Sequence, residues 1–105
     1  EDSYAMAARN EYTLKYFGLE ASKETLRNKT FQALQDRGWI VESDGNPIKA
    51  KLIEMRQTAV ASFNISDNSI YVDTKGSMVD GNKPYVPKRY VDNVIASVRS
   101  LLKDK

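Results

Sequence analysis

The fold is decided by Leu34-Gln35-Asp36-Arg37-Gly38-Trp39-Ile40, because within this stretch a helical pattern stops and a strand pattern begins. Gly38 suits the first position beyond a helix C-cap, where the backbone takes a positive φ that glycine reaches without a Cβ clash. Trp39 and Leu34 are then the pair that touches in a Schellman ending. We predict that Trp39 anchors the core at this corner; stacking on a ligand is the alternative role for its ring.

The residues before this corner, Ser22 to Arg37, have the pattern of an amphipathic helix. Ser22 is a suitable N-cap, and Glu24 lies in the first turn, where a carboxylate complements the helix dipole. The positions at helical spacing that predict the buried stripe are Leu26, Thr30, Ala33 and Leu34.

The beginning of the chain has two interpretations. Alternation at Tyr12, Leu14 and Tyr16 indicates a short strand that ends at Gly18. A helix from Ser3 to Phe17 is the competing interpretation.

After the corner the apolar residues recur at every second position, which is typical of strands. The strand segments are Trp39–Val41, Ile48–Leu52, Ala59–Ile65 and Ile70–Val72. One turn is predicted at Ser43-Asp44-Gly45-Asn46-Pro47, because Asp-Gly tolerates positive φ and Pro47 cannot donate to a central ladder. Another is predicted at Asp67-Asn68. The parity slips at Ile53 and Met55, which indicates a bulge or a tight turn near Arg56-Gln57.

The last third of the chain predicts a loop and a helix. Lys75 to Val86 contains glycine, asparagine and proline with little period, so we expect a long surface loop. Pro87 suits the first residue of a helix. The apolar stripe of that helix is Val91, Val94, Ile95, Val98, Leu101 and Leu102.

These patterns predict an α+β fold. Because the turns are short, we expect an antiparallel meander of three to four strands, packed on one face by an N-terminal and a C-terminal helix. With 105 residues the chain has the size of one domain. We expect a single domain, 1–105, with a compact core at 22–103; residues 1–21 are either flexible or a short extra strand.

Composition excludes several chemistries. The chain has no cysteine and no histidine, which removes thiol nucleophiles, zinc fingers, triad hydrolases and histidine-based metal sites. We therefore predict no catalytic residues, no cofactor and no metal site. The formal net charge is +2, which is small for a nucleic-acid binder. No apolar run reaches the roughly 20 residues of a membrane span.

The chain resembles a group of small exported bacterial domains, many of them described as lipoproteins of unknown function. The resemblance covers Ser22 to about Leu102. The residues that carry it are Gln32-Ala33-Leu34, Arg37-Gly38-Trp39, Ile48-Lys49-Ala50, Leu52, Ala59, Ala61, Ile65, Ser77-Met78-Val79 and Tyr90-Val91. The resemblance implies an α+β fold and a location in the cell envelope: periplasm, or attachment to the outer membrane after removal of a signal. A cytoplasmic location is the alternative. Because the sequence begins at Glu1, a signal before it would not be visible.

The candidate partner-binding residues are Tyr85, Lys88 and Arg89, in a basic and aromatic cluster at the start of the last helix. A domain that binds double-stranded RNA has the order helix, three strands, helix, and it is the main alternative. A small hydrolase that uses carboxylates, drawn from Asp44, Asp67, Asp73 and Asp80, is the second alternative. The function that we expect is a non-enzymatic interaction or structural module of the envelope, with another envelope protein or an envelope polymer as partner.

Overall fold

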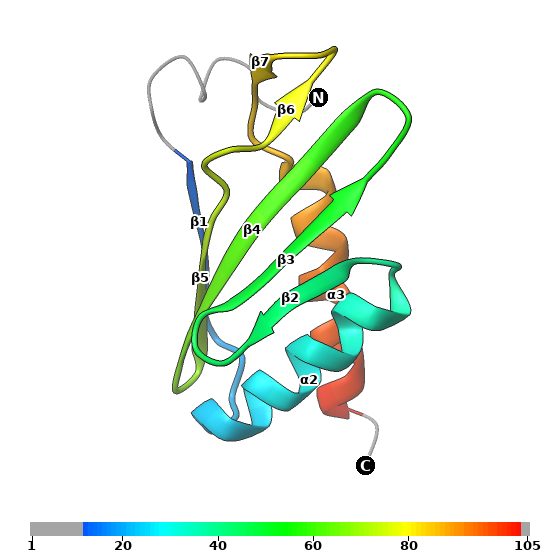
Figure 1. Cartoon of the computed structure of the whole chain (residues 1–105). Coiled ribbons are helices and arrows are strands. Elements are labelled where there is room, and N and C mark those ends of the chain that lie inside the picture. The colour runs from blue at the N-terminus through cyan, green and yellow to red at the C-terminus, as the bar shows by residue number, and fades with distance from the viewer. Residues whose placement is uncertain (1–11, 104–105) are drawn as a thin grey trace.

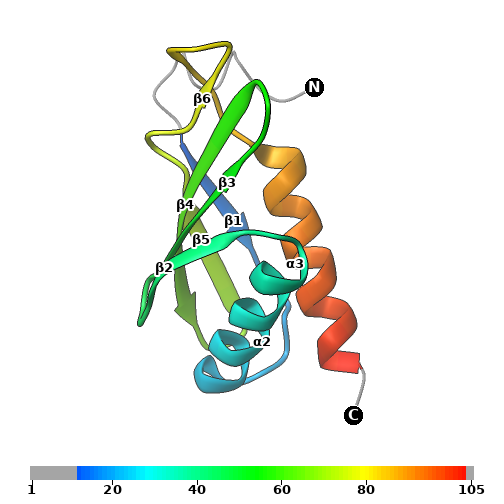
Figure 2. The same ribbon diagram turned by 45° about the vertical axis from the view of Figure 1, so that its right-hand side comes forward.

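A computed structural model describes residues 12–103 and shows two helices on one side of an antiparallel sheet (Figures 1 and 2). The helices are α2 (Lys23–Asp36) and α3 (Lys88–Lys103). The strands are β1 (Thr13–Tyr16), β2 (Ile40–Asp44), β3 (Ile48–Ile53), β4 (Gln57–Ser66), β5 (Ser69–Asp73), β6 (Met78–Val79) and β7 (Lys83–Pro84). The main strand order is β1-β5-β4-β3-β2, β6 pairs with the start of β4, and β7 pairs with β6. The predicted α+β class, with an N-terminal and a C-terminal helix on the sheet, is confirmed.

The corner at Gly38 has the geometry that the sequence predicts. Gly38 has a φ of 84°. Its N–H donates to the Gln35 carbonyl at 3.1 Å, and the Trp39 N–H donates to the Leu34 carbonyl at 2.9 Å. These two bonds define a Schellman motif, so the chain leaves α2 and enters β2 with two helix-end carbonyls satisfied. At the other end of α2, the Ser22 side chain accepts from the Thr25 N–H, which confirms the N-cap.

Replacing Gly38 with alanine should lower the free energy of unfolding by about 1 kcal/mol, because a residue with a Cβ is strained at this φ. No atom beyond the two adjacent residues lies within 4 Å of the added Cβ, so the cost comes from the backbone conformation rather than from overlap with other parts of the fold. Gly45→Ala is the matched control, since Gly45 has equally open space and no positive φ. Urea unfolding should show Gly45→Ala within about 0.5 kcal/mol of the parent. Equal losses from the two changes would refute the role of the left-handed corner.

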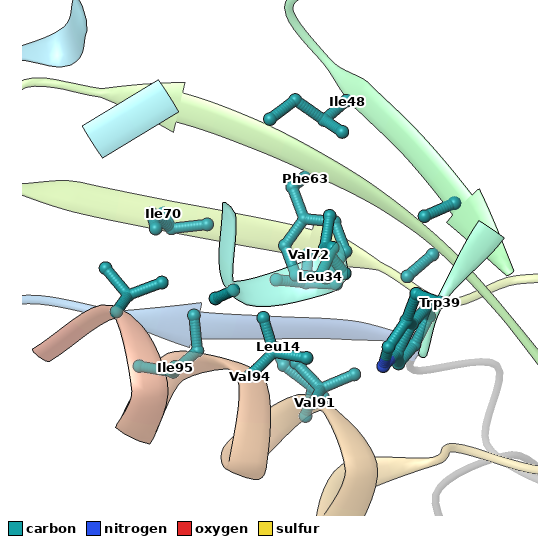
Figure 3. Packing of buried hydrophobic residues seen from close by; sticks show 14 of the residues in the cluster. Leu14, Leu34, Trp39, Ile48, Phe63, Ile70, Val72, Val91, Val94 and Ile95 are labelled. Atoms are coloured by element: carbon teal, nitrogen blue, oxygen red, sulfur yellow. The ribbon is translucent and has the colours of Figure 1, made fainter. Parts of the chain in front are cut away.

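The core lies between the sheet and the two helices. Trp39 is 5% exposed, and its ring meets the ring of Phe63 edge to face at a centroid distance of 6.1 Å. Figure 3 shows Phe63 and Val72 of the sheet beside Leu34 of α2, while Val91 of α3 lies near Leu14. Trp39 is therefore buried as the core anchor that we predict, and its burial leaves little of the ring for a ligand to stack on.

The strand interpretation of the first described residues is correct. β1 pairs antiparallel with β5, from Thr13 opposite Asp73 to Tyr16 opposite Ile70. Gly18 follows at a φ of 72°, as the predicted strand end requires. The alternative helix is wrong over residues 12–17; its earlier part lies outside the described residues.

The turn before β3 forms where predicted, but its backbone conformation differs from the one expected. Gly45 does not have a positive φ, and the Asn46–Pro47 peptide bond is cis. The Asn46 side chain bonds to both backbone groups of Ile65, donating to its carbonyl at 3.0 Å and accepting from its N–H at 2.9 Å. The side chain of Asn46 thus continues the hydrogen bonding of β4 past Ile48, the first residue of β3.

The parity slip at Ile53 and Met55 marks a turn rather than a bulge. The register of β3 against β4 is unbroken from Ile48–Phe63 to Ile53–Thr58. The bulge lies instead in β2, between Val41 and Ser43. Beside it, Arg27 of α2 donates to the main-chain carbonyl of Asp44 at 2.9 Å.

The prediction that Lys75 to Val86 is a surface loop without regular structure is wrong in part. This segment contains β6 and β7, and it buries Ser77, Val79, Tyr85 and Val86. The Ser77 hydroxyl accepts from the Val60 N–H at 2.8 Å and donates to the Val60 carbonyl at 3.0 Å. A side chain therefore fills the gap in the ladder of β4 between β5 and β6, and this anchors the segment.

Candidate functional site

The three predicted partner-binding residues do not form one exposed cluster. Tyr85 is only 2% exposed, so the expectation that it lies at the surface of a loop is wrong. Lys88 and Arg89 are exposed in the first turn of α3. The sequence pattern missed the burial of Tyr85, because the segment around it has no strand or helix period.

Lys88 belongs to a brace between α3 and β1. Its ammonium lies 2.6 Å from Asp92 Oδ2, and the Tyr16 hydroxyl donates to Asp92 Oδ1 at 2.6 Å. Burial, followed by the hydrogen bond and the negative charge of Asp92, raises the pKa of Tyr16 well above its ordinary value. The phenol therefore stays protonated and donating, and the charge of Lys88 is already partly neutralised.

Two of the four aspartates considered for acid–base chemistry serve the backbone. Asp67 accepts from the Lys23 N–H at 2.7 Å, and Asp73 accepts from the Lys75 N–H at 3.1 Å. Asp80 instead forms an ion pair with Arg56 at 2.9 Å. Over residues 12–103, no three histidine, cysteine, aspartate or glutamate side chains gather where they could hold a metal ion.

The face of the sheet that points away from α2 and α3 carries the surface features that the sequence analysis left unassigned. We call it the open face (Figure 2). Its side chains follow from the strand registers, because residues that lie opposite one another project to the same side. One cross-strand row is Lys15, Tyr71 and Asn64, and the next is Thr13, Asp73, Ser62 and Lys49. A third row is Ile40, Lys51 and Val60.

The open face also collects exposed apolar side chains. The large exposed apolar residues among those described are Phe17, Ile40, Ile53, Met55 and Tyr71. Three of them project from strands of the open face, and Phe17 packs edge to face on Tyr71 at 5.8 Å. Met55, which is 97% exposed, lies in the β3–β4 turn at the end of this face. Ile40, Ile53 and Tyr71 occupy the polar parity of their strands, but only the strand register brings them to one surface.

A shallow hollow lies on the open face around Tyr71. Its lining side chains are Thr13, Asn64, Ser66, Ser69, Tyr71 and Asp73. All but Tyr71 are small polar residues, and every one of the six offers a hydrogen-bonding group. The hollow therefore places one aromatic ring among several hydrogen-bond donors and acceptors.

No protein-family model matches this chain, and no curated protein matches it either. The resemblance to small exported bacterial domains accordingly stays a prediction. Neither α2 nor α3 has the length and apolar character needed to cross a membrane.

Proposed function

We propose that this chain is a non-enzymatic interaction module of the bacterial cell envelope, and that it contacts its partner through the open face. One observation carries the proposal: the large exposed apolar side chains of the described chain lie on or beside the open face, and α2 and α3 contribute none of them. Exposed apolar groups gathered on one face are typical of interaction surfaces. The location rests on the resemblance to exported domains.

The alternative of duplex RNA binding is less well supported by the geometry. Phosphate contacts need cations that are free to replace counterions. Lys88 is paired with Asp92 at 2.6 Å, and β1 and β5 add strands beyond the helix, three strands, helix order of that domain class.

The first test measures binding to envelope material. Purified protein should sediment with isolated envelopes, and the double change Ile53→Ser and Met55→Ser should weaken that binding about tenfold or more. Burial of these two side chains contributes about 1.4 kcal/mol or more, which corresponds to a factor of ten. Asn93→Ser, an exposed position on α3, is the matched control and should bind like the parent.

Localisation provides a second arm of the same test. The product of the complete reading frame should fractionate with periplasm or outer membrane, and its precursor should carry a signal followed by a lipid-bearing cysteine. Recovery in the cytoplasm, or equal binding by the double variant and the parent, would contradict the proposal.

A further inference from the structure

We infer that the hollow around Tyr71 is a binding site for a neutral saccharide unit of an extended glycan. The inference rests on the proposed function and narrows its partner to an envelope polymer. The hollow lies at the β1–β5–β4 part of the open face, whereas Ile53 and Met55 lie at its other end.

The shape of the hollow comes from residue sizes and strand registers. Tyr71 stands at the centre of its row, between Lys15 on β1 and Asn64 on β4. The positions around it hold small side chains, with Ser66 opposite Ser69 and Thr13 opposite Asp73. Apart from Lys15 and Phe17, the neighbours of Tyr71 on this face are shorter than its ring, which leaves a depression beside the ring. Phe17 packs on Tyr71 at an interplanar angle of 83° and supports the ring.

The polar groups of the hollow are available to a ligand. Within residues 12–103, the hydroxyls of Thr13, Ser66 and Ser69 make no hydrogen bond to the protein. Asp73 uses Oδ1 for the Lys75 N–H, and its Oδ2 has no partner in the described part of the chain. Asn64 uses its Nδ2 for two long contacts of 3.4 Å, to the carbonyls of Ser62 and Tyr71, which leaves Oδ1 as an acceptor.

These groups match the chemistry of a sugar ring. A pyranose has a C–H face that packs on an aromatic ring and an equatorial belt of hydroxyls that both donate and accept. The carboxylate and the amide oxygen can accept from hydroxyls, and the serine and threonine hydroxyls can donate. Ligand sites commonly combine such a ring with a few placed polar groups.

The negative charge of Asp73 in the hollow favours a neutral ligand over an anionic one. Asp73 lines the hollow itself, so a phosphate or carboxylate bound there would face a like charge. Lys15 and Lys49 lie in the same rows but outside the lining. A single-stranded nucleic acid, which also uses aromatic platforms, would place its phosphates near this carboxylate. A peptide is less well matched because the hollow has no apolar floor beyond Tyr71.

The test is a titration of the ¹⁵N-labelled protein with tetramers of glucose and of N-acetylglucosamine, followed by amide chemical shifts. We expect saturable shifts on β1, β4 and β5 with a Kd of about 1 mM, since an open hollow buries little of its ligand. Tyr71→Ala should abolish the shifts, and Asp73→Asn should weaken binding about threefold to tenfold, because a neutral acceptor is weaker than a charged one. Asn93→Ser, the exposed position on α3, is the control and should bind the sugars like the parent.

Three outcomes would overturn the inference. The first is the absence of shifts for either tetramer at about ten times the expected Kd. The second is tighter binding of oligothymidylate at the same residues, strengthened by Asp73→Asn, which would indicate a nucleic acid. The third is unchanged sugar binding in Tyr71→Ala; if that variant fails to fold, Asp73→Asn decides alone. Because the envelope test uses Ile53 and Met55, loss of sugar binding with retained sedimentation would refute only the present inference.

Discussion

Replacing Trp39 with alanine should lower the free energy of unfolding by about 3–5 kcal/mol, because it removes a large buried ring and leaves a cavity. Trp39 is 5% exposed and packs edge to face on Phe63. Its N–H also completes the helix ending through the Leu34 carbonyl, but alanine retains that backbone bond. The loss therefore measures the side chain alone. A domain of this size has only about 5–15 kcal/mol of stability, so at the lower end of that range much of the variant would be unfolded in the cell.

The control is Ile40→Ala, the next residue, whose side chain is half exposed on the opposite face of the sheet. Urea unfolding of the two variants should separate them by about 2 kcal/mol or more. If Trp39→Ala unfolded with the same midpoint and slope as the parent, the corner would not anchor the core. Trp39 would then have to be considered as a surface group.

Replacing Tyr85 with alanine should lower the free energy of unfolding by about 3 kcal/mol, as expected for a large buried aromatic residue. The sequence alone suggests the opposite, a nearly silent change in an exposed loop. The structure reverses this expectation because Tyr85 is 2% exposed and its N–H donates to the Ser77 carbonyl at 3.3 Å. Ser77 in turn bonds to both backbone groups of Val60.

Lys83→Ala is the control for Tyr85, since Lys83 is exposed in β7 of the same segment. It should change stability by no more than about 0.5 kcal/mol. Equal, small effects of both changes on thermal unfolding would show that the segment 75–86 adds little to the core. Equal, large effects would mean that the hairpin, rather than the Tyr85 side chain, is the sensitive part.

The parts of the fold that follow from local chemistry could be predicted from the sequence. The N-cap at Ser22, the helix end at Gly38 and the alternation in β4 each depend on neighbouring residues, and each forms as expected. The stripe of α3 is equally local, with Val91, Val94, Ile95 and Val98 buried. Local signals of this kind are the most reliable part of a sequence interpretation.

The parts that depend on distant partners could not be predicted. β1 is stabilised by β5, which lies far along the chain, so its own alternation leaves a strand and a helix equally open. The segment 75–86 is held by the side chain of Ser77, which bonds to the backbone of Val60 in β4. The pattern of apolar residues in the sequence does not predict such a bond. The open face was missed for a related reason. Ile40, Ile53 and Tyr71 lie on different strands, and only the register brings them to one surface.

The irregular edge at β2 affects whether two copies of the protein can pair through their sheet edges. An edge strand with free backbone groups can pair with the edge of another molecule and start aggregation. In β2 the bulge between Val41 and Ser43 breaks the regular spacing of those groups, and Arg27 covers the carbonyl of Asp44. Both features oppose the stacking of copies edge to edge. Pairing of two copies through β2 is therefore disfavoured, although the apolar side chains of the open face stay exposed.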